Sequence, residues 1–131
     1  MIRPLLASLG LVALSACTVV PGGGQVPYPA APEGYRVSID APVKVGAVTV
    51  TPVELVEDSR CPTGVQCVWA GRLILKTRID GDGWRETTDL TLGQRYETRG
   101  NPVTLVRAEP ERREDAPIDP SQYRFTFAAT P

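Results

Sequence analysis

The chain has 131 residues, and its 14 Lys and Arg against 15 Asp and Glu give a net charge of −1 at neutral pH. No basic run stands out, so nucleic acid is not an expected partner. The chain contains no histidine, which removes the commonest general base of enzymes and a frequent zinc ligand.

An apolar run near the amino terminus has the layout of a secretory signal peptide. Arg3 precedes it, and it extends over residues 4–13. That is shorter than the roughly 20 apolar residues that span a bilayer as a helix. The run ends in "LSAC", residues 14–17. This ending, with two small residues before a cysteine, resembles the lipobox of bacterial lipoproteins.

The lipobox resemblance implies that residues 1–16 are a cleaved signal peptide and that the Cys17 thiol carries a diacylglycerol. Acyl chains bury about 0.8 kcal/mol per methylene, so such an anchor would hold the chain to a membrane. In sorting as known from enteric lipoproteins, Thr18 in place of Asp implies delivery to the outer membrane, facing the periplasm. The alternative is an ordinary secretory peptide cut after Ala16, which leaves Cys17 as a free thiol.

Residues 17–34 form a segment rich in Pro and Gly without a hydrophobic period, which predicts a flexible tether after the lipidated Cys17. Residues 35–131 then suffice for one domain with a modest core.

The domain shows an apolar alternation with a period of two, which is typical of β-strands. It is clearest over residues 67–79, where alternate positions are apolar or small and the positions between become charged. Trp69 shares the apolar face with Cys67, so we expect its ring to pack inward against a disulfide. The "DGDG" turn at 80–83 and a strand at 84–92 complete a predicted hairpin.

Further strands are predicted at 35–39, 46–57, 102–108 and 123–127. Within 46–57 the alternation changes parity near Pro52, which predicts a bulge or edge kink. The sequence therefore predicts an all-β fold, a single small antiparallel β-sandwich or barrel of about six to seven strands.

Cys61 and Cys67 enclose a loop that contains Pro62 and Gly64. In the oxidising space outside the cytoplasm, a structural disulfide is the expected state. A metal site would need ligands besides two thiolates, and a redox pair usually has two intervening residues and a helix amino terminus. We expect no metal and no other cofactor.

The segment "EDSRCPTGVQCVWAG", residues 57–71, resembles a motif of small, uncharacterised bacterial lipoproteins and secreted proteins. The pattern is Asp-Ser-Arg-Cys-Pro, a short loop, then Gln-Cys, an apolar residue, Trp, a small residue and Gly. The resemblance implies a fold and a location in the cell envelope, and it carries no activity.

Asp58, Ser59, Arg60 and Gln66 form a candidate binding loop. The alternative is local: Asp and Ser bond the turn backbone, and Arg60 pairs with a nearby carboxylate. With no catalytic pair distinguishable, we expect a non-enzymatic, membrane-anchored domain that binds a protein or other envelope component. The alternatives are an inhibitor of an envelope-attacking enzyme and, third, a thiol-redox or hydrolytic enzyme.

Overall fold

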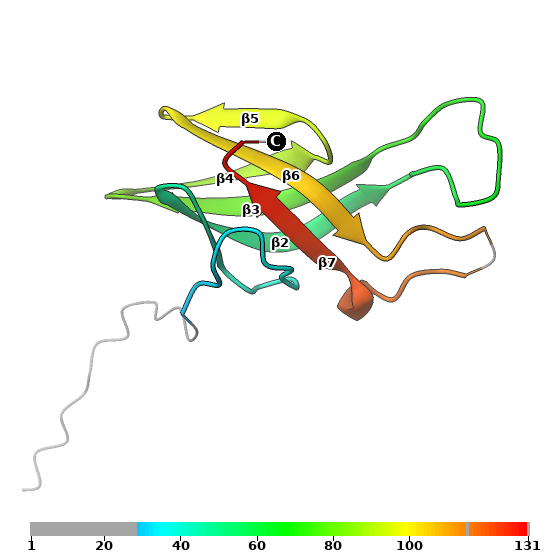
Figure 1. Ribbon diagram of the computed structural model, residues 1–131, viewed down its shortest axis with the longest axis horizontal. Helices are drawn as coiled ribbons and strands as arrows, with labels where there is room; N and C mark the ends of the chain where they lie inside the picture. The colour runs from blue at the N-terminus through cyan, green and yellow to red at the C-terminus, as the bar shows by residue number, and fades with distance from the viewer. Residues whose placement is uncertain (1–28, 115, 131) are drawn as a thin grey trace, which may run out of the picture.

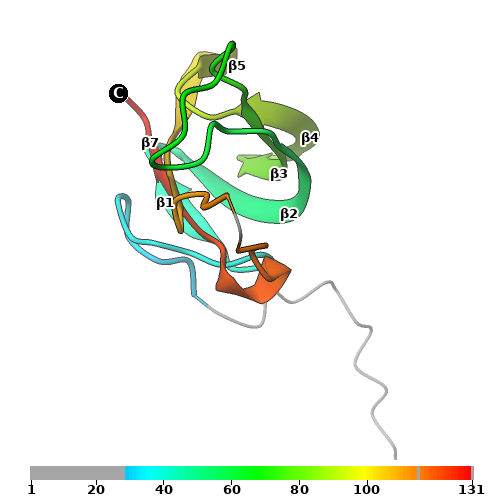
Figure 2. The ribbon, with the colours of Figure 1, turned by 90° about the vertical axis from the view of Figure 1, so that its right-hand side faces the viewer.

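The computed structural model describes residues 29–114 and 116–130 as an all-β domain (Figure 1). Two antiparallel sheets pack as a sandwich, one with the strand order β1-β2-β3-β4 and the other with the order β5-β6-β7 (Figure 2). The predicted fold class is confirmed. The elements are β1 (Val43–Val45), β2 (Val48–Asp58), β3 (Leu73–Gly81), β4 (Trp84–Thr91), β5 (Arg95–Thr98), β6 (Asn101–Glu109), the 3-10 turn η1 (Pro120–Gln122) and β7 (Arg124–Ala128).

The core lies between the two sheets and follows the alternation of the strands. From Leu73 to Ile79 in β3 every second residue is fully buried, and the residues between are only partly covered. Complete burial of one such large side chain stabilises the fold by about 1.5–3 kcal/mol. The largest fully buried side chains are Phe125, Phe127, Leu73, Leu75, Ile79, Leu90 and Leu105.

Three irregularities in the strand pairing each add one residue, and each added residue is a valine with an exposed side chain. The register of β2 against β3 shifts across Val53 and again across Val56, and that of β6 against β7 shifts across Val106. A bulge resets which residues face the core. The predicted irregularity beside Pro52 is therefore confirmed, and it lets Leu55 pack against the core after the parity change.

The predicted strand at 35–39 is wrong. Left-handed backbone at Gly34 and Asp40 flanks this segment, and only Val37 bridges to another strand, through two backbone hydrogen bonds with Phe125. The structure instead contains two short strands, β1 and β5, that the sequence pattern did not predict.

The end of the expected tether also differs from the prediction, because residues 31–33 are bound to the domain. The backbone of Ala31 bonds with Pro42 and Lys44, and the Glu33 carboxylate accepts bonds from the N–H groups of Gly46 and Ala129. Cys17 and the leader lie outside the described residues.

Two long loops project together from one end of the sandwich, at the right of Figure 1. One joins β2 to β3 over residues 59–72, and the other joins β6 to η1 over residues 110–119. Residues 29–34 lie toward the opposite end. Within the part of the chain that the structure describes, no helix has the length and apolarity needed to cross a bilayer.

Candidate functional site

The loop of residues 59–72 carries the cysteine pair. The two sulfur atoms lie at disulfide-bonding distance, as the sequence predicts, and the Cα atoms are 5.9 Å apart. Ser59 and Arg72, the first and last residues of the loop, are hydrogen-bonded to each other; this pair is called the stem below. The Ser59 N–H donates to the Arg72 carbonyl at 2.8 Å, and the Arg72 N–H donates to Ser59 Oγ at 3.0 Å. The loop is therefore closed twice, by covalent and by hydrogen bonds.

Gly71 makes this stem possible. Its φ is +66°, in the left-handed region that favours glycine, and a Cβ added there would lie 1.8 Å from the Ser59 carbonyl oxygen. No heavier residue can occupy the position unless the stem opens. The turn at Gly71 separates β3 from the residues before it. β3 therefore starts at Leu73 and not at Cys67 as expected.

The prediction that Trp69 packs inward is wrong for this reason. Because Gly71 breaks the alternation, the parity of β3 does not extend back to Trp69. Its side chain is 75% exposed, and the neighbouring Val68 is 93% exposed. No charged residue occurs from Cys61 to Gly71. The loop therefore presents an uncharged tip with two apolar side chains in water; Val68 and Trp69 are called the apolar tip below.

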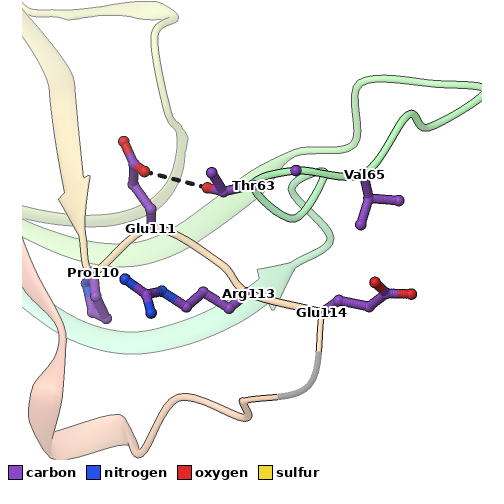
Figure 3. Close-up of a pocket in the computed structure, with 7 residues that line it drawn as sticks. Thr63, Val65, Pro110, Glu111, Arg113 and Glu114 are labelled. Atoms are coloured by element: carbon purple, nitrogen blue, oxygen red, sulfur yellow. Dashed lines mark hydrogen bonds between the residues drawn. The ribbon is translucent and has the colours of Figure 1, made fainter.

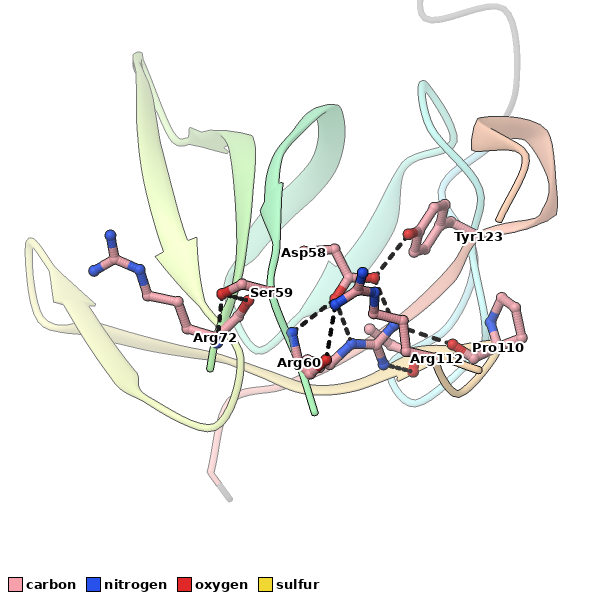
Figure 4. A network of polar contacts seen from close by, with 8 residues as sticks. Asp58, Ser59, Arg60, Arg72, Pro110, Arg112 and Tyr123 are labelled. Carbon is pink, nitrogen blue, oxygen red and sulfur yellow. Dashed lines mark hydrogen bonds and ion pairs between the residues drawn. The ribbon is translucent and has the colours of Figure 1, made fainter. Parts of the chain in front are cut away.

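A polar cluster at the base of the loop, the clamp, consists of Asp58, Arg60, Arg112 and Tyr123 (Figure 4). Arg60 Nε donates to Asp58 Oδ1 at 2.8 Å, and Arg60 Nη2 donates to Asp58 Oδ2 at 2.9 Å. Tyr123 Oη donates to the same Oδ2 at 2.7 Å. The side chains of this ion pair are only 7% (Asp58) and 17% (Arg60) exposed.

The clamp also holds the second loop. Arg60 donates to the carbonyl oxygens of Ala108 and Pro110, both at 3.1 Å. In return, Arg112 Nη1 donates to the Arg60 carbonyl at 3.0 Å. Backbone oxygens 48 and 50 residues away in sequence thus accept from two of the three remaining guanidinium donors, and the two projecting loops are fixed to one another.

The electrostatics of the clamp favour the charged pair. Burial alone would raise the pKa of Asp58, but hydrogen bonds from Arg60 and Tyr123 and the Arg60 charge outweigh it, so the pKa is lowered. The hydrogen bond to Asp58 raises the pKa of Arg60. For Tyr123, burial and then the bond to Asp58 raise the pKa to about 12.

Of the candidate binding residues, three are therefore engaged within the protein. Asp58 and Arg60 bond each other, and Ser59 bonds the stem, as the local alternative anticipates. Gln66 is exposed on the loop. The alternation of apolar residues did not predict the exposure of Val68 and Trp69. The signal in the sequence was Gly71, because a glycine can interrupt a strand with a positive φ.

A hollow of about 640 Å³ separates the two loops (Figure 3). The Thr63 hydroxyl donates to Glu111 across it at 3.2 Å, and the Thr63 N–H donates to the Arg112 carbonyl at 2.8 Å. Its charged side chains are Glu111, Arg113 and Glu114. The first half of the cysteine loop, at Thr63, Gly64 and Val65, thus faces charged side chains of both signs on the second loop.

Among the residues that the structure describes, no group of three or more His, Cys, Asp or Glu side chains is arranged to hold a metal ion. No family model, curated protein or solved structure matches the chain. The candidate site therefore rests on its own geometry.

We predict that Gly71→Ala destabilises the fold well beyond Gly83→Ala. Both glycines have a positive φ, but open space surrounds Gly83, whereas a Cβ at Gly71 meets the Ser59 carbonyl. The conformational penalty alone is about 1 kcal/mol in each variant, and only Gly71→Ala adds the steric one. Urea unfolding measures both. Equal losses would contradict the close approach at the stem.

We predict that Tyr123→Phe destabilises the fold by about 1–2 kcal/mol, because a partly buried carboxylate loses a donor. The unfolded tyrosine titrates near 10 and the folded one near 12. The hydroxyl's contribution should therefore be complete below pH 10 and disappear as the pH rises toward 12.

Urea titrations at pH 7 and at alkaline pH test this difference. Tyr35→Phe is the matched control, because Tyr35 is 62% exposed. A Tyr123→Phe variant as stable as Tyr35→Phe at pH 7 would show that the bond to Asp58 contributes nothing.

Proposed function

We propose that this chain is a lipid-anchored protein of the bacterial cell envelope and that its β-domain is a non-catalytic module that binds a protein partner through the apolar tip. The observation that carries the binding proposal is the exposure of Val68 and Trp69 on a loop that the cysteine pair, the stem and the clamp all hold in place.

Apolar side chains that are held exposed on an ordered loop favour binding to another protein. Tryptophan is among the residues that contribute most to protein interfaces, and burial of such a ring stabilises a complex by about 2–4 kcal/mol. A loop already ordered before binding loses little entropy on association. Nothing in the described fold covers the tip, whereas the other large aromatic side chains near the core, such as Tyr123 and Phe125, are buried.

The surroundings of the tip favour a protein over a lipid surface. Glu111, Arg113 and Glu114, on the second loop, share a hollow with Thr63, Gly64 and Val65 of the loop that carries the tip. An apolar centre with a polar border is the usual anatomy of a protein–protein interface. The two carboxylates on the neighbouring loop would instead be repelled by the anionic lipids of a membrane.

The membrane anchor in this proposal is the acylated Cys17, supported by the lipobox resemblance of residues 14–17 and by the motif resemblance of residues 57–71. Thr18 supports the outer membrane, with the domain in the periplasm. The loop end of the sandwich lies away from residues 29–34, where the chain enters the domain (Figure 1). A partner would thus be met on the side facing away from the tether.

Inhibition of an envelope-attacking enzyme is a second candidate for the same surface. The observation that favours it is the projection of a covalently closed loop from one end of the domain. A rigid convex loop fits an enzyme cleft, and binding of a hydrolase with loss of its activity would distinguish this candidate from simple docking.

We predict that a photo-crosslinking amino acid at position 66, an exposed position of the same loop, forms one discrete protein adduct in cells of the native host. The substitution Trp69→Ser in the same chain should reduce its yield at least about tenfold, since it removes the aromatic anchor. A crosslinker at position 35 is the control, because Tyr35 is also exposed, at 62%, and lies outside the cysteine loop.

No adduct at position 66, the same adduct from position 35, or an undiminished yield in Trp69→Ser would contradict docking by the tip. The anchor is tested separately by metabolic labelling with a fatty acid, which Cys17→Ser should abolish. Absence of labelling in the unsubstituted chain, with the adduct still formed, would contradict the anchor and leave the docking proposal standing.

A further inference from the structure

A second surface, distant in sequence from the cysteine loop, collects arginines on the outer face of the smaller sheet. In β6 and β7 the inward residues Ala108 and Phe125 are buried and paired. Their neighbours Arg107 and Arg124 therefore face outward. Because Val37 bridges antiparallel to Phe125 and is buried as well, Arg36 joins the same outer face.

These arginines border a hollow of about 680 Å³ at the end of β6 and the start of β7. Arg36, Arg107 and Arg124 come from separate segments, and Figure 1 shows β6 and β7 side by side there. The acidic residues of the hollow are Glu109 and Glu111, so three positive charges face two negative ones in a chain whose net charge is −1.

The guanidinium groups have more donors than the protein uses. Glu109 lies between two of them, 3.3 Å from Arg36 Nη1 and 4.0 Å from Arg107 Nη1. Each guanidinium carries five N–H donors, and a single carboxylate cannot satisfy two of these groups. Arg36 and Arg107 are 67% and 68% exposed, so the unused donors point into water.

Arg124 is fixed differently. Its Nη1 donates to the carbonyl oxygens of Ser121 and Tyr123, both at 2.8 Å. These bonds hold its guanidinium at the border of the hollow, beside Glu109, which is its partner across the strand pair. The third positive charge is thus ordered, while Arg36 and Arg107 remain adjustable.

We propose that this hollow binds a phosphate group, with Arg36 and Arg107 as the donors and Arg124 as a fixed neighbouring charge. Arginine matches phosphate oxygens with paired N–H bonds, and it binds them more strongly than it binds a shared carboxylate at long range. Glu109, which lies between the Arg36 and Arg107 guanidinium groups, moves aside when phosphate binds. The group is free phosphate or the phosphodiester of a lipid headgroup.

Glu109 gives this proposal a signature that a general surface charge would not show. Loss of its carboxylate removes an internal competitor, so Glu109→Gln should bind phosphate several-fold more tightly. Arg36→Gln combined with Arg107→Gln should weaken binding at least tenfold, since two charge-assisted contacts are lost. Arg85→Gln removes an exposed arginine of β4, in the other sheet, and should leave binding unchanged.

Isothermal titration of the full chain in non-ionic detergent tests these expectations with two probes, inorganic phosphate and glycerophosphoglycerol, the deacylated headgroup of phosphatidylglycerol. The probe that binds more tightly identifies the source of the phosphate group. Thermal unfolding of each variant confirms that the fold is retained.

Three results would overturn the proposal. The first is no heat of binding with either probe up to about 10 mM, which means a binding free energy weaker than about 3 kcal/mol. The second is an equal loss of affinity in Arg85→Gln, which would indicate a general effect of surface charge, and the third is weaker phosphate binding in Glu109→Gln, which would give that carboxylate a different role.

Discussion

The ion pair between Asp58 and Arg60 connects the end of β2, in one sheet, to β6 and β7, in the other sheet. Removing two charges from water is unfavourable unless the remaining donors and acceptors are matched. Here the match is close, because Tyr123 adds a donor to Asp58, and the carbonyls of Ala108 and Pro110 accept from Arg60. The end of β2, the end of β6 and the start of β7 are thereby joined at one point. Either charged side chain without the other would leave a buried charge uncompensated.

Different parts of the cysteine loop have different structural roles. The "DSR" residues, 58–60, form the clamp and the stem, and the residues beyond the first cysteine need no contact with the core to stay in place. This independence explains how Val68 and Trp69 can remain in water on a well-formed domain. The arginines at 36, 107 and 124 lie on the outer face of the other sheet, and the hollow that they border shares Pro110 and Glu111 with the hollow between the loops.

Much of the fold follows from local pattern. The period of two predicts most of β2, β3, β4, β6 and β7, and the parity change beside Pro52 predicts the first bulge. The strands β1 and β5 are missed because three or four residues are too few for an alternation to be visible. The segment at 35–39 has the pattern of a strand, yet turns on both sides allow it a single bridge.

The candidate sites were less predictable, because they depend on distant contacts. Sequence predicts the cysteine pair and offers the local bonding of Asp58 and Arg60 as an alternative. It cannot predict that Arg60 reaches carbonyls 48 and 50 residues away. Likewise, Arg36, Arg107 and Arg124 become neighbours only through the register of β6, β7 and the Val37 bridge.

Exchange of the Arg60 Nε proton with solvent, followed by NMR, tests the clamp most directly. A bond of 2.8 Å to a buried carboxylate predicts exchange at least about tenfold slower than at the exposed Arg36, and equal rates at both would contradict a closed clamp.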